Sequence, residues 1–283
     1  MNGLLVIDKP GGMTSRDAVN RVQRWFPRKT KIGHTGTLDP LATGVLVVCV
    51  GAATRLAEYV QAMGKSYASR FRLGATSTTD DADGDVTETG AAPLPRESID
   101  AALARFVGVV QQTPPAFSAM KVDGRRAHAL ARAGEDVKLN ARAVRIDAVR
   151  VVGITWPWLD VEVDCGKGTY IRSIARDLGV ALGVGGMVQT LRRTRVGPFT
   201  VEQGVGVDER PADLALRPMA EALGETPRVT LGADELRRFR MGQSVRIAAR
   251  VSGAVGIVDD TGELVGLATA AGDVVRPEAV FYV

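Results

Sequence analysis

Apolar and acidic residues alternate strictly between Leu159 and Cys165, and this alternation is the sharpest constraint that the sequence places on the fold. Successive side chains of a β-strand point to opposite faces, so the pattern predicts a strand with one face in the core and the other toward water. The apolar set is Leu159, Val161, Val163 and Cys165, and the acidic set is Asp160, Glu162 and Asp164.

Residues 66–73 alternate in the same manner, with Tyr67 and Phe71 on one face and Arg70 and Arg72 on the other. Apolar residues recur at helical spacing near residues 96–107, 124–134 and 172–182. Strands and helices are interspersed along the chain without a regular βαβ period. The sequence therefore favours an α+β fold, in which helices pack against a mixed, largely antiparallel sheet.

The two ends of the chain give further local predictions. Residues Leu4–Ile7 predict a short buried strand, and Thr14 with Asp17 three residues later resembles a capping box at a helix start. Beyond residue 225 the chain contains short β-rich runs, with a hairpin signal at residues 259–262. We expect a small, β-barrel-like C-terminal unit there.

Composition narrows the class of protein only in part. The net charge of +4 permits a polyanionic partner without requiring one. Cys49 and Cys165 lie in strand-like segments and are expected as free core thiols, which fits a reducing cytoplasm. The two histidines and two cysteines show no CxxC or HxxxH spacing, so no zinc site is expected. The longest apolar stretch, residues 41–53, is too short to span a bilayer, and we expect a cytoplasmic protein without a membrane partner.

The acidic segment 76–90 has a superficial likeness to a calcium-binding loop. The register that fits Asp81 and Asp83 puts Thr79 at the first ligand position and Gly90 where the closing glutamate should be. We therefore expect no metal in this segment.

Residues 33–44, with the sequence GHTGTLDPLATG, hold a single carboxylate in a glycine-rich stretch. Pro40 disfavours the α region for the preceding residue, so Asp39 is expected in an extended or turn conformation. A carboxylate on a stiff turn suits a nucleophile or a general base. The same Asp-Pro pair fits an ordinary helix start, with Asp39 as the N-cap and Pro40 at the first helical position. The residue pattern alone leaves both interpretations open.

This stretch resembles the signature of the TruB family of RNA pseudouridine synthases. The resemblance continues in the family's order over most of residues 3–200, through LLVIDKPGGMTS (4–15), KSYASRFRLGATSTTDDADG (65–84), TPPAFSAMKVDGRRAHALARAG (113–134), GKGTYIRSIARDLG (166–179) and LRRTRVGPF (191–199). It implies a catalytic domain over residues 1–225 with an RNA-gripping insertion at about 113–140, and a PUA-like RNA-binding domain over 226–283.

The resemblance further implies an isomerase that acts without a guide RNA on the T arm of tRNA and converts uridine 55 to pseudouridine. A stacked base cannot be reached, so the target base must be flipped into a pocket. The reaction includes no redox step and no phosphoryl transfer, so neither a cofactor nor a metal is expected. Single-stranded loops with splayed bases are what proteins read in RNA, and the family recognises the folded T arm largely by its shape. No protein partner is implied.

Three catalytic roles follow from the resemblance. Asp39 matches the nucleophile, and attack on the ribose, attack on the uracil ring and removal of a sugar proton all stay open. Tyr67 matches a tyrosine that stacks on the base and takes part in proton transfer, although its strand position also fits a core aromatic. Arg172 matches the partner of the carboxylate, where a surface ion pair is the ordinary alternative.

Three substrate-binding roles also follow. Leu191 matches an apolar wall of the uracil pocket, and His34 matches a histidine that stacks near the flipped nucleotide. Tyr170 is assigned to the same pocket, and continuing the phase of the 159–165 strand also puts Tyr170 and Arg172 off the apolar face. The ordinary alternative for Leu191 is packing in the core, and the ordinary alternative for His34 is a place in a turn.

Seven basic residues match positions from which the family grips the RNA backbone. They are Lys121, Arg125, Arg126 and Arg132 in the insertion, and Arg192, Arg193 and Arg195 after the pocket leucine. Such contacts position RNA without reading its sequence, and a solvated edge is the ordinary alternative.

Two other functions fit the same residues. A related enzyme directed by guide RNA in a ribonucleoprotein would be inert on naked tRNA. A non-catalytic RNA-binding or tRNA-folding protein would be expected to have lost Asp39, Tyr67 or Arg172, and all three are present.

Overall fold

The computed structural model describes residues 1–118, 120–122, 124–135 and 137–281. Among these residues, nine strands form the main sheet, in the order β1-β3-β12-β4-β11-β10-β7, with β2 beside β3 and β13 beside β12. The strands are β1 (Gly3–Lys9), β2 (Ile32–His34), β3 (Thr43–Val50), β4 (Lys65–Leu73), β7 (Gly108–Gln112), β10 (Arg142–Thr155), β11 (Trp158–Cys165), β12 (Gly186–Val196) and β13 (Phe199–Thr200). Two small hairpins add β5 (Ala75–Ser77) with β6 (Val86–Glu88), and β8 (Lys121–Val122) with β9 (Arg125–Arg126).

Strand β12 lies in the middle of this sheet although it comes late in the chain. It runs parallel to β3, where Arg193 pairs with Gly44, and antiparallel to β4, where Arg193 pairs with Tyr67. The other pairs recorded in this sheet are antiparallel. The predicted α+β class with a largely antiparallel sheet is confirmed.

The alternating segments form neighbouring strands. Strand β4 buries Tyr67, Phe71 and Leu73 and exposes Arg70, while β11 buries the four apolar residues of the 159–165 pattern. By contrast, β1 and β3 are buried along almost their whole length. Their near-continuous apolar runs follow from cover on both faces of the sheet.

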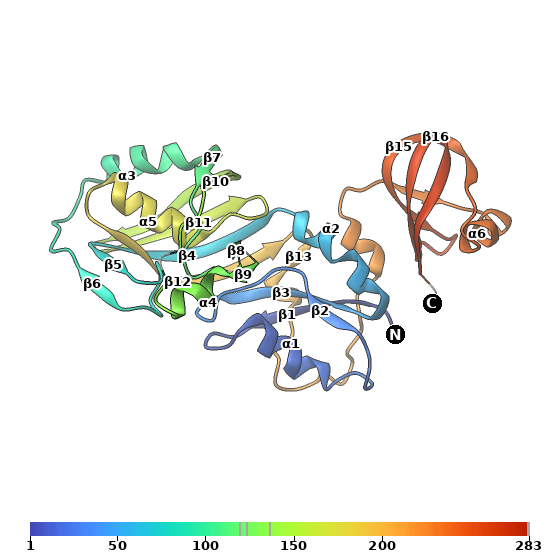
Figure 1. The fold of residues 1–283 in the computed structure, drawn as a ribbon, viewed down its shortest axis with the longest axis horizontal. Coiled ribbons are helices and arrows are strands. Elements are labelled where there is room, and N and C mark those ends of the chain that lie inside the picture. Colours follow the sequence, from blue (N-terminus) through green and yellow to red (C-terminus); the bar gives the residue numbers. More distant parts are fainter. Residues whose placement is uncertain (119, 123, 136, 282–283) are drawn as a thin grey trace.

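One face of the sheet is covered by helices α1 (Ser15–Gln23), α3 (Arg96–Leu103) and α5 (Ile171–Ala181), which share one apolar cluster with it. Figure 1 shows α3 and α5 together on the same side of the sheet. The expected capping box is present at the start of α1, where the Asp17 amide donates to Thr14 Oγ1 at 3.1 Å and the Thr14 amide to Asp17 Oδ2 at 3.0 Å. The other face packs on α2 (Ala57–Ala62) and on the 3-10 helices Gly51–Leu56 and Met219–Leu223. Two short 3-10 turns, Ala104–Phe106 and Val201–Gln203, follow α3 and β13.

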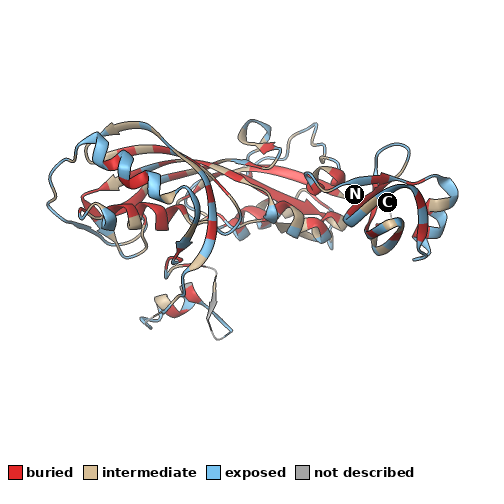
Figure 2. Cartoon of the chain, turned by 90° about the horizontal axis from the view of Figure 1, so that it is seen from above, coloured by how far each residue is buried: buried red, intermediate tan, exposed pale blue. Residues whose placement is uncertain are grey.

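A segment carrying β8, β9 and α4 (Ala127–Arg132) projects away from the sheet (Figure 2). The predicted helix over 124–134 is therefore too long. Its first residues, Arg125 and Arg126, pair with Lys121 and Val122 in a short hairpin, and the helix begins only at Ala127.

The C-terminal elements form a separate three-stranded sheet of β14 (Arg228–Thr230), β15 (Val245–Val258) and β16 (Leu264–Val280), with helix α6 (Ala233–Arg240) packed on it. The predicted hairpin at 259–262 joins β15 to β16. Within the described residues, the expected β-barrel-like unit is this sheet and not a closed barrel. A domain boundary near residue 225 stays a prediction, because Phe281 shares an apolar cluster with Leu4 and Val47 of the main sheet.

Both cysteines are buried free thiols, as the sequence predicts. Across the described part of the chain, the helices are too short or too polar to cross a membrane.

Candidate active site

Asp39 lies in the connection between β2 and β3, which turns sharply without forming a helix. The Ala42 amide donates a hydrogen bond of 3.1 Å to the Asp39 carbonyl, and the chain then enters β3 at Thr43. The interpretation of Asp39 as a helix N-cap is therefore wrong. Ser15, the first residue of α1, anchors the preceding Leu38, because its Oγ accepts from the Leu38 amide at 2.7 Å.

A buried lysine secures the other side of this turn. The Nζ of Lys9, which has no exposed surface, donates to the carbonyls of Pro10 at 2.8 Å, Met13 at 2.7 Å and Pro40 at 3.3 Å. Burial lowers the pKa of Lys9 to about 8, and the nearby Asp39 carboxylate opposes that change. The residue after Asp39 is thus held to the turn that follows β1.

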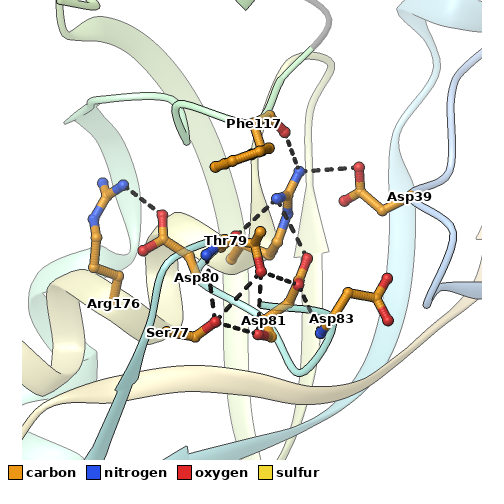
Figure 3. Close-up of polar contacts among 9 residues, drawn as sticks. Asp39, Ser77, Thr79, Asp80, Asp81, Asp83, Phe117 and Arg176 are labelled. Atoms are coloured by element: carbon orange, nitrogen blue, oxygen red, sulfur yellow. Dashed lines mark hydrogen bonds and ion pairs between the residues drawn. The ribbon is translucent and has the colours of Figure 1, made fainter. Parts of the chain in front are cut away.

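The Asp39 carboxyl meets a buried arginine from the first turn of α5. Arg172 Nη2 lies 2.9 Å from Asp39 Oδ1 and also donates to the Phe117 carbonyl at 2.9 Å (Figure 3). The Arg172 side chain is only 3% exposed, against 31% for Asp39. A surface ion pair, the ordinary alternative for Arg172, is excluded by this burial.

The acidic loop after β5 completes the surroundings of Arg172. Arg172 Nη1 donates to the Thr79 carbonyl at 2.9 Å and lies 3.3 Å from Asp81 Oδ2. The same loop presents Asp80 to Arg176, one helical turn further along α5, at 3.0 Å (Figure 3). In the structure, the carboxylates of Asp80 and Asp81 therefore bind arginines.

The electrostatics at Asp39 are a balance between burial and an ion pair. Burial raises the pKa of the Asp39 carboxyl, Arg172 opposes this, and the neighbouring Asp81 carboxylate adds to the rise. Together these influences raise the pKa of the Asp39 carboxyl above the ordinary value for aspartate. A carboxyl of this kind is a stronger base than an exposed aspartate, and Arg172 fixes its orientation.

Asp39 opens into a pocket of about 600 Å³. The six catalytic and substrate-binding residues expected from the sequence all line this one pocket: His34, Asp39, Tyr67, Tyr170, Arg172 and Leu191. They come from β2, the following loop, β4, the start of α5 and β12, so residues far apart in the sequence converge here.

Tyr67 belongs both to the core and to the pocket. Its ring is 8% exposed and packs in the main apolar cluster, yet it also forms part of the pocket wall. Burial raises the pKa of Tyr67, and the Arg193 guanidinium opposes the rise. The two sequence interpretations of Tyr67 are thus compatible.

Tyr170 precedes α5 and is fixed by Gln112. The Tyr170 amide donates to Gln112 Oε1 at 2.8 Å, and Gln112 Nε2 donates to the Tyr170 carbonyl at 3.1 Å. The guanidinium of Arg142 lies 5.2 Å from the centre of the Tyr170 ring. The strand-phase argument for Tyr170 and Arg172 is wrong, because β11 ends at Cys165 and Arg172 is helical.

Leu191 is buried on β12 and faces the pocket. His34 is half-buried, and among the described residues its Nδ1 has no hydrogen-bond partner. Burial, Arg16 and Arg193 all lower the pKa of His34, which keeps the imidazole neutral at pH 7.

The basic residues expected to follow the RNA backbone differ in their surroundings. Arg125 and Arg126 are exposed on the projecting segment, whereas the side chains of Lys121 and Arg132 lie outside the described part of the structure. Arg192 is paired with Asp8 at 2.8 Å, and Arg195 lies 3.7 Å from Asp164.

Arg193 is the exception and requires a correction. Its side chain is buried, with 2% exposure, and therefore lacks the open position that a phosphate contact needs. Strand periodicity could have revealed this, since Arg193 follows the pocket residue Leu191 by two positions and shares its face. The sequence did not point to Lys9 and Asp81 as parts of the site. Lys9 reaches the Asp39 turn through Pro40, and Asp81 reaches Arg172, and both contacts join positions far apart in the sequence.

Known proteins resemble this chain in sequence and in fold. A model of the TruB family pseudouridylate synthase N-terminal domain matches residues 24–171. A model of the tRNA pseudouridylate synthase B C-terminal domain matches residues 172–212, and one of the pseudouridine synthase II TruB C-terminal region matches residues 227–281.

Relatives match along the whole chain. The tRNA pseudouridine synthase B of Thermobifida fusca (strain YX) is 43% identical over 290 residues. The match covers 99% of this chain and 98% of the Thermobifida fusca protein. The tRNA pseudouridine synthase B of Mycobacterium bovis (strain BCG / Pasteur 1173P2) is 45% identical over 286 residues. The match covers 98% of this chain and 95% of the Mycobacterium bovis protein. A solved H/ACA RNP bound to a substrate RNA containing 2'-deoxyuridine aligns with a TM-score of 0.75 at 25% identity, over 99% of this chain and 85% of that chain.

Proposed function

The chain belongs to the TruB family of pseudouridylate synthases, and from that premise we propose that it converts uridine 55 in the T-loop of tRNA to pseudouridine, with Asp39 as the acting carboxylate. A pseudouridine synthase is an isomerase. The relatives named tRNA pseudouridine synthase B support tRNA as its substrate.

The reaction breaks the bond between ribose C1′ and uracil N1 and forms a bond between C1′ and C5. The proton on C5 is lost and N1 gains one, so the overall composition is unchanged. Attack on C1′, attack on the ring and removal of a sugar proton each begin with an ionised carboxylate next to the nucleotide. Asp39, held by Arg172 at 2.9 Å on the wall of the pocket, is suited to each of these steps.

One observation carries the proposal: a carboxylate, the arginine that binds it, and two apolar side chains line the same pocket. Tyr67 and Leu191 supply aromatic and apolar surfaces that can sandwich a flipped base. The Tyr67 hydroxyl is the group that we assign to proton transfer at C5. His34 and Tyr170 line the same pocket and are assigned to the flipped nucleotide.

We assign the exposed arginines of the projecting segment, Arg125 and Arg126, to the phosphates of the T arm. Arg192 and Arg195 extend this track along β12. Each such contact releases counterions, so tRNA affinity should fall as salt rises. We also propose that residues 226–283, the part of the chain that carries the C-terminal sheet, form an RNA-binding domain separate from the catalytic domain.

Action without a guide RNA is favoured by the relatives. Identity to enzymes named for tRNA is 40–45% over nearly the full chain, against 25% to the ribonucleoprotein subunit. Incubation of the purified protein with unmodified tRNA separates the two modes, because a guide-dependent enzyme would leave naked tRNA unchanged.

The proposal is tested with Asp39→Asn and, as a matched control, Asp160→Asn on the solvent face of β11. Pseudouridine is located by mass spectrometry of cyanoethylated tRNA fragments. We expect the wild type and Asp160→Asn to modify the T-loop uridine, and Asp39→Asn to form no product while binding tRNA within a few-fold of wild type. Retained turnover in Asp39→Asn, or modification at another position only, would refute the assignment.

A further inference from the structure

Arg193 is a buried cation that the reaction scheme above does not use. Its side chain is 2% exposed, although it contributes to the pocket wall. Arg172, the other buried arginine of the pocket, has two carboxylate partners, whereas none of the ion pairs recorded among the described residues includes Arg193. A buried charge is costly unless it is hydrogen-bonded or meets an opposite charge, so its position requires an explanation.

The guanidinium of Arg193 spans the loop that carries Asp39. Its Nε donates to the Val45 carbonyl at 2.7 Å, and its Nη2 donates to the Gly36 carbonyl at 3.0 Å. Its Nη1 makes a longer contact of 3.4 Å with the Thr37 carbonyl. The bonded carbonyls therefore lie on both sides of Asp39, and one side chain on β12 joins the two ends of the loop.

The backbone around Arg193 fits the loop as closely as its side chain does. Gly44 has a φ of +98°, and a Cβ at that position would lie 2.2 Å from the Arg193 carbonyl oxygen. Only glycine permits this approach of β3 to β12. The cation and the loop therefore have a fixed relative position.

On its other side Arg193 pairs across the sheet with Tyr67. The charged and titratable groups that influence Tyr67 are Arg193 on β12, Cys165 on β11 and Asp39 in the loop. Arg193 in turn lowers the pKa values of three neighbouring basic groups, Lys9 on β1, His34 on β2 and Lys65 on β4. Arg193 thus adds positive charge to a region that already holds three basic groups, next to the phenol of Tyr67.

We propose that Arg193 is a positioning residue of the isomerisation, which holds the Asp39 loop against β12 and places a permanent positive charge beside the hydroxyl of Tyr67. This inference rests on the proposed function. The several N–H donors of the guanidinium, here called its fork, bind carbonyls on both sides of Asp39 and so fix the carboxylate that acts on the nucleotide. The charge favours the ionised form of the phenol when it takes part in proton transfer.

The test compares Arg193→Lys, which keeps the charge but loses the fork, with Arg193→Met, which removes the charge at similar length. Arg70→Met is the control, because Arg70 lies on the solvent face of β4 and pairs only with Asp160 among the described residues. Single-turnover pseudouridine formation on unmodified tRNA is measured from pH 6 to 11, with circular dichroism at each pH to show that the protein stays folded. The Kd for tRNA and the melting temperature are measured on the same preparations.

We expect Arg193→Met to lower the single-turnover rate by about 100-fold or more, the usual effect of removing a preorganised electrostatic partner. Its Kd for tRNA should stay within about threefold of wild type, since Arg193 is only 2% exposed and is not assigned a phosphate contact. The alkaline part of its pH–rate profile should move to higher pH, because the phenol loses its cation. Arg193→Lys should recover at least tenfold in rate and keep the wild-type profile.

Other outcomes would overturn the inference. These are a rate for Arg193→Met within threefold of wild type, equal losses of rate and tRNA affinity, or a slow Arg193→Lys with an unshifted profile in Arg193→Met. If Arg193→Met does not fold, Arg193→Lys decides: about a tenfold slower rate at unchanged Kd supports the role of the fork, and a wild-type rate contradicts it. An inactive wild type would instead refute the proposed function.

Discussion

At the scale of single residues, the Asp39 carboxyl is held between two opposing influences. Burial disfavours its charge, while the Arg172 guanidinium at 2.9 Å favours it. Arg172 also contacts Asp81 and the carbonyls of Thr79 and Phe117 through its two Nη atoms, while its Nε has no hydrogen-bond partner among the described residues. Arg172 therefore remains in place when Asp39 changes its charge.

The raised pKa of Asp39 predicts the acidic limit of activity. Under the proposed function only the ionised form of Asp39 acts, so the single-turnover rate should fall as the pH falls through a value above about 3.9, the ordinary pKa of aspartate. Arg172→Gln removes the opposing cation and should move this fall to higher pH. The measurement is a pH–rate profile from pH 4 to 8, with circular dichroism to show that the protein stays folded. A rate that is constant down to the ordinary range would contradict the prediction.

The same pKa direction bears on stability. An acid whose pKa is raised in the folded protein binds its proton more tightly there than in the unfolded chain, so its ionisation at neutral pH costs stability. Asp39→Asn should therefore not lower the melting temperature, and its loss of activity would not reflect unfolding.

For Tyr67, two substitutions separate packing from chemistry. Tyr67→Phe keeps the buried ring and should melt close to wild type, whereas Tyr67→Ala should cost about 3–5 kcal/mol of unfolding free energy. Both should slow catalysis far more than they weaken tRNA binding. The comparison requires single-turnover rates, tRNA Kd values and denaturant melts. Equal losses of rate and affinity would make Tyr67 a packing residue only.

At the scale of secondary-structure elements, the parallel contact between β3 and β12 brings the Asp39 loop to Leu191 and Arg193. Gly44→Ala should be strongly destabilising, because its Cβ would lie 2.2 Å from the Arg193 carbonyl oxygen in addition to the strain of a positive φ. Backbone strain alone costs about 1–3 kcal/mol. Gly90→Ala is the control, since Gly90 has a φ of +70° and a Cβ added there would meet no heavy atom within 4 Å. Equal destabilisation of both variants in urea melts would contradict the argument.

Local patterns were sufficient for many elements. Strict alternation located β4 and β11, the Thr14–Asp17 pair located the start of α1, and the hairpin signal located the turn between β15 and β16. These features depend on neighbours within a few residues. The helix expected over 124–134 was too long, since cross-strand pairing of Arg125 and Arg126 overrides their helical propensity.

The site was predictable only through the family resemblance, which selected its residues and also paired Arg172 with Asp39. That contact joins positions 133 residues apart, so no local pattern encodes it. The basic residues after Leu191 show a different limit. Alternation from Leu191 places Arg193 and Arg195 on one face, yet β12 buries Arg193 and exposes Arg195 beyond a register shift.

At the scale of the whole molecule, the C-terminal sheet is attached to the main sheet through a shared apolar cluster. Phe281 is 1% exposed in this cluster, the Arg55 guanidinium lies 5.2 Å from its ring centre, and Arg55 Nη1 donates to the Val280 carbonyl at 3.0 Å. The C-terminal sheet also has its own core, which includes Phe239.

Substitution of these two phenylalanines should therefore destabilise different parts of the molecule. Phe281→Ala should cost about 3–5 kcal/mol and make the chain near residue 225 sensitive to limited proteolysis, while the released C-terminal fragment stays intact. Phe239→Ala should instead expose the C-terminal sheet itself to digestion. Identical digestion patterns for the two variants would contradict a separately packed C-terminal unit.

The central position of β12 also matters while the protein is being synthesised. Strands β3 and β4 leave the ribosome more than a hundred residues before β12, and β12 is the strand that later fills the space between them. Until then both present unpaired edges, which invite association with other chains. A nascent chain that stalls before residue 186 would therefore be inactive and prone to aggregate, and rapid, uninterrupted translation through β12 would protect it.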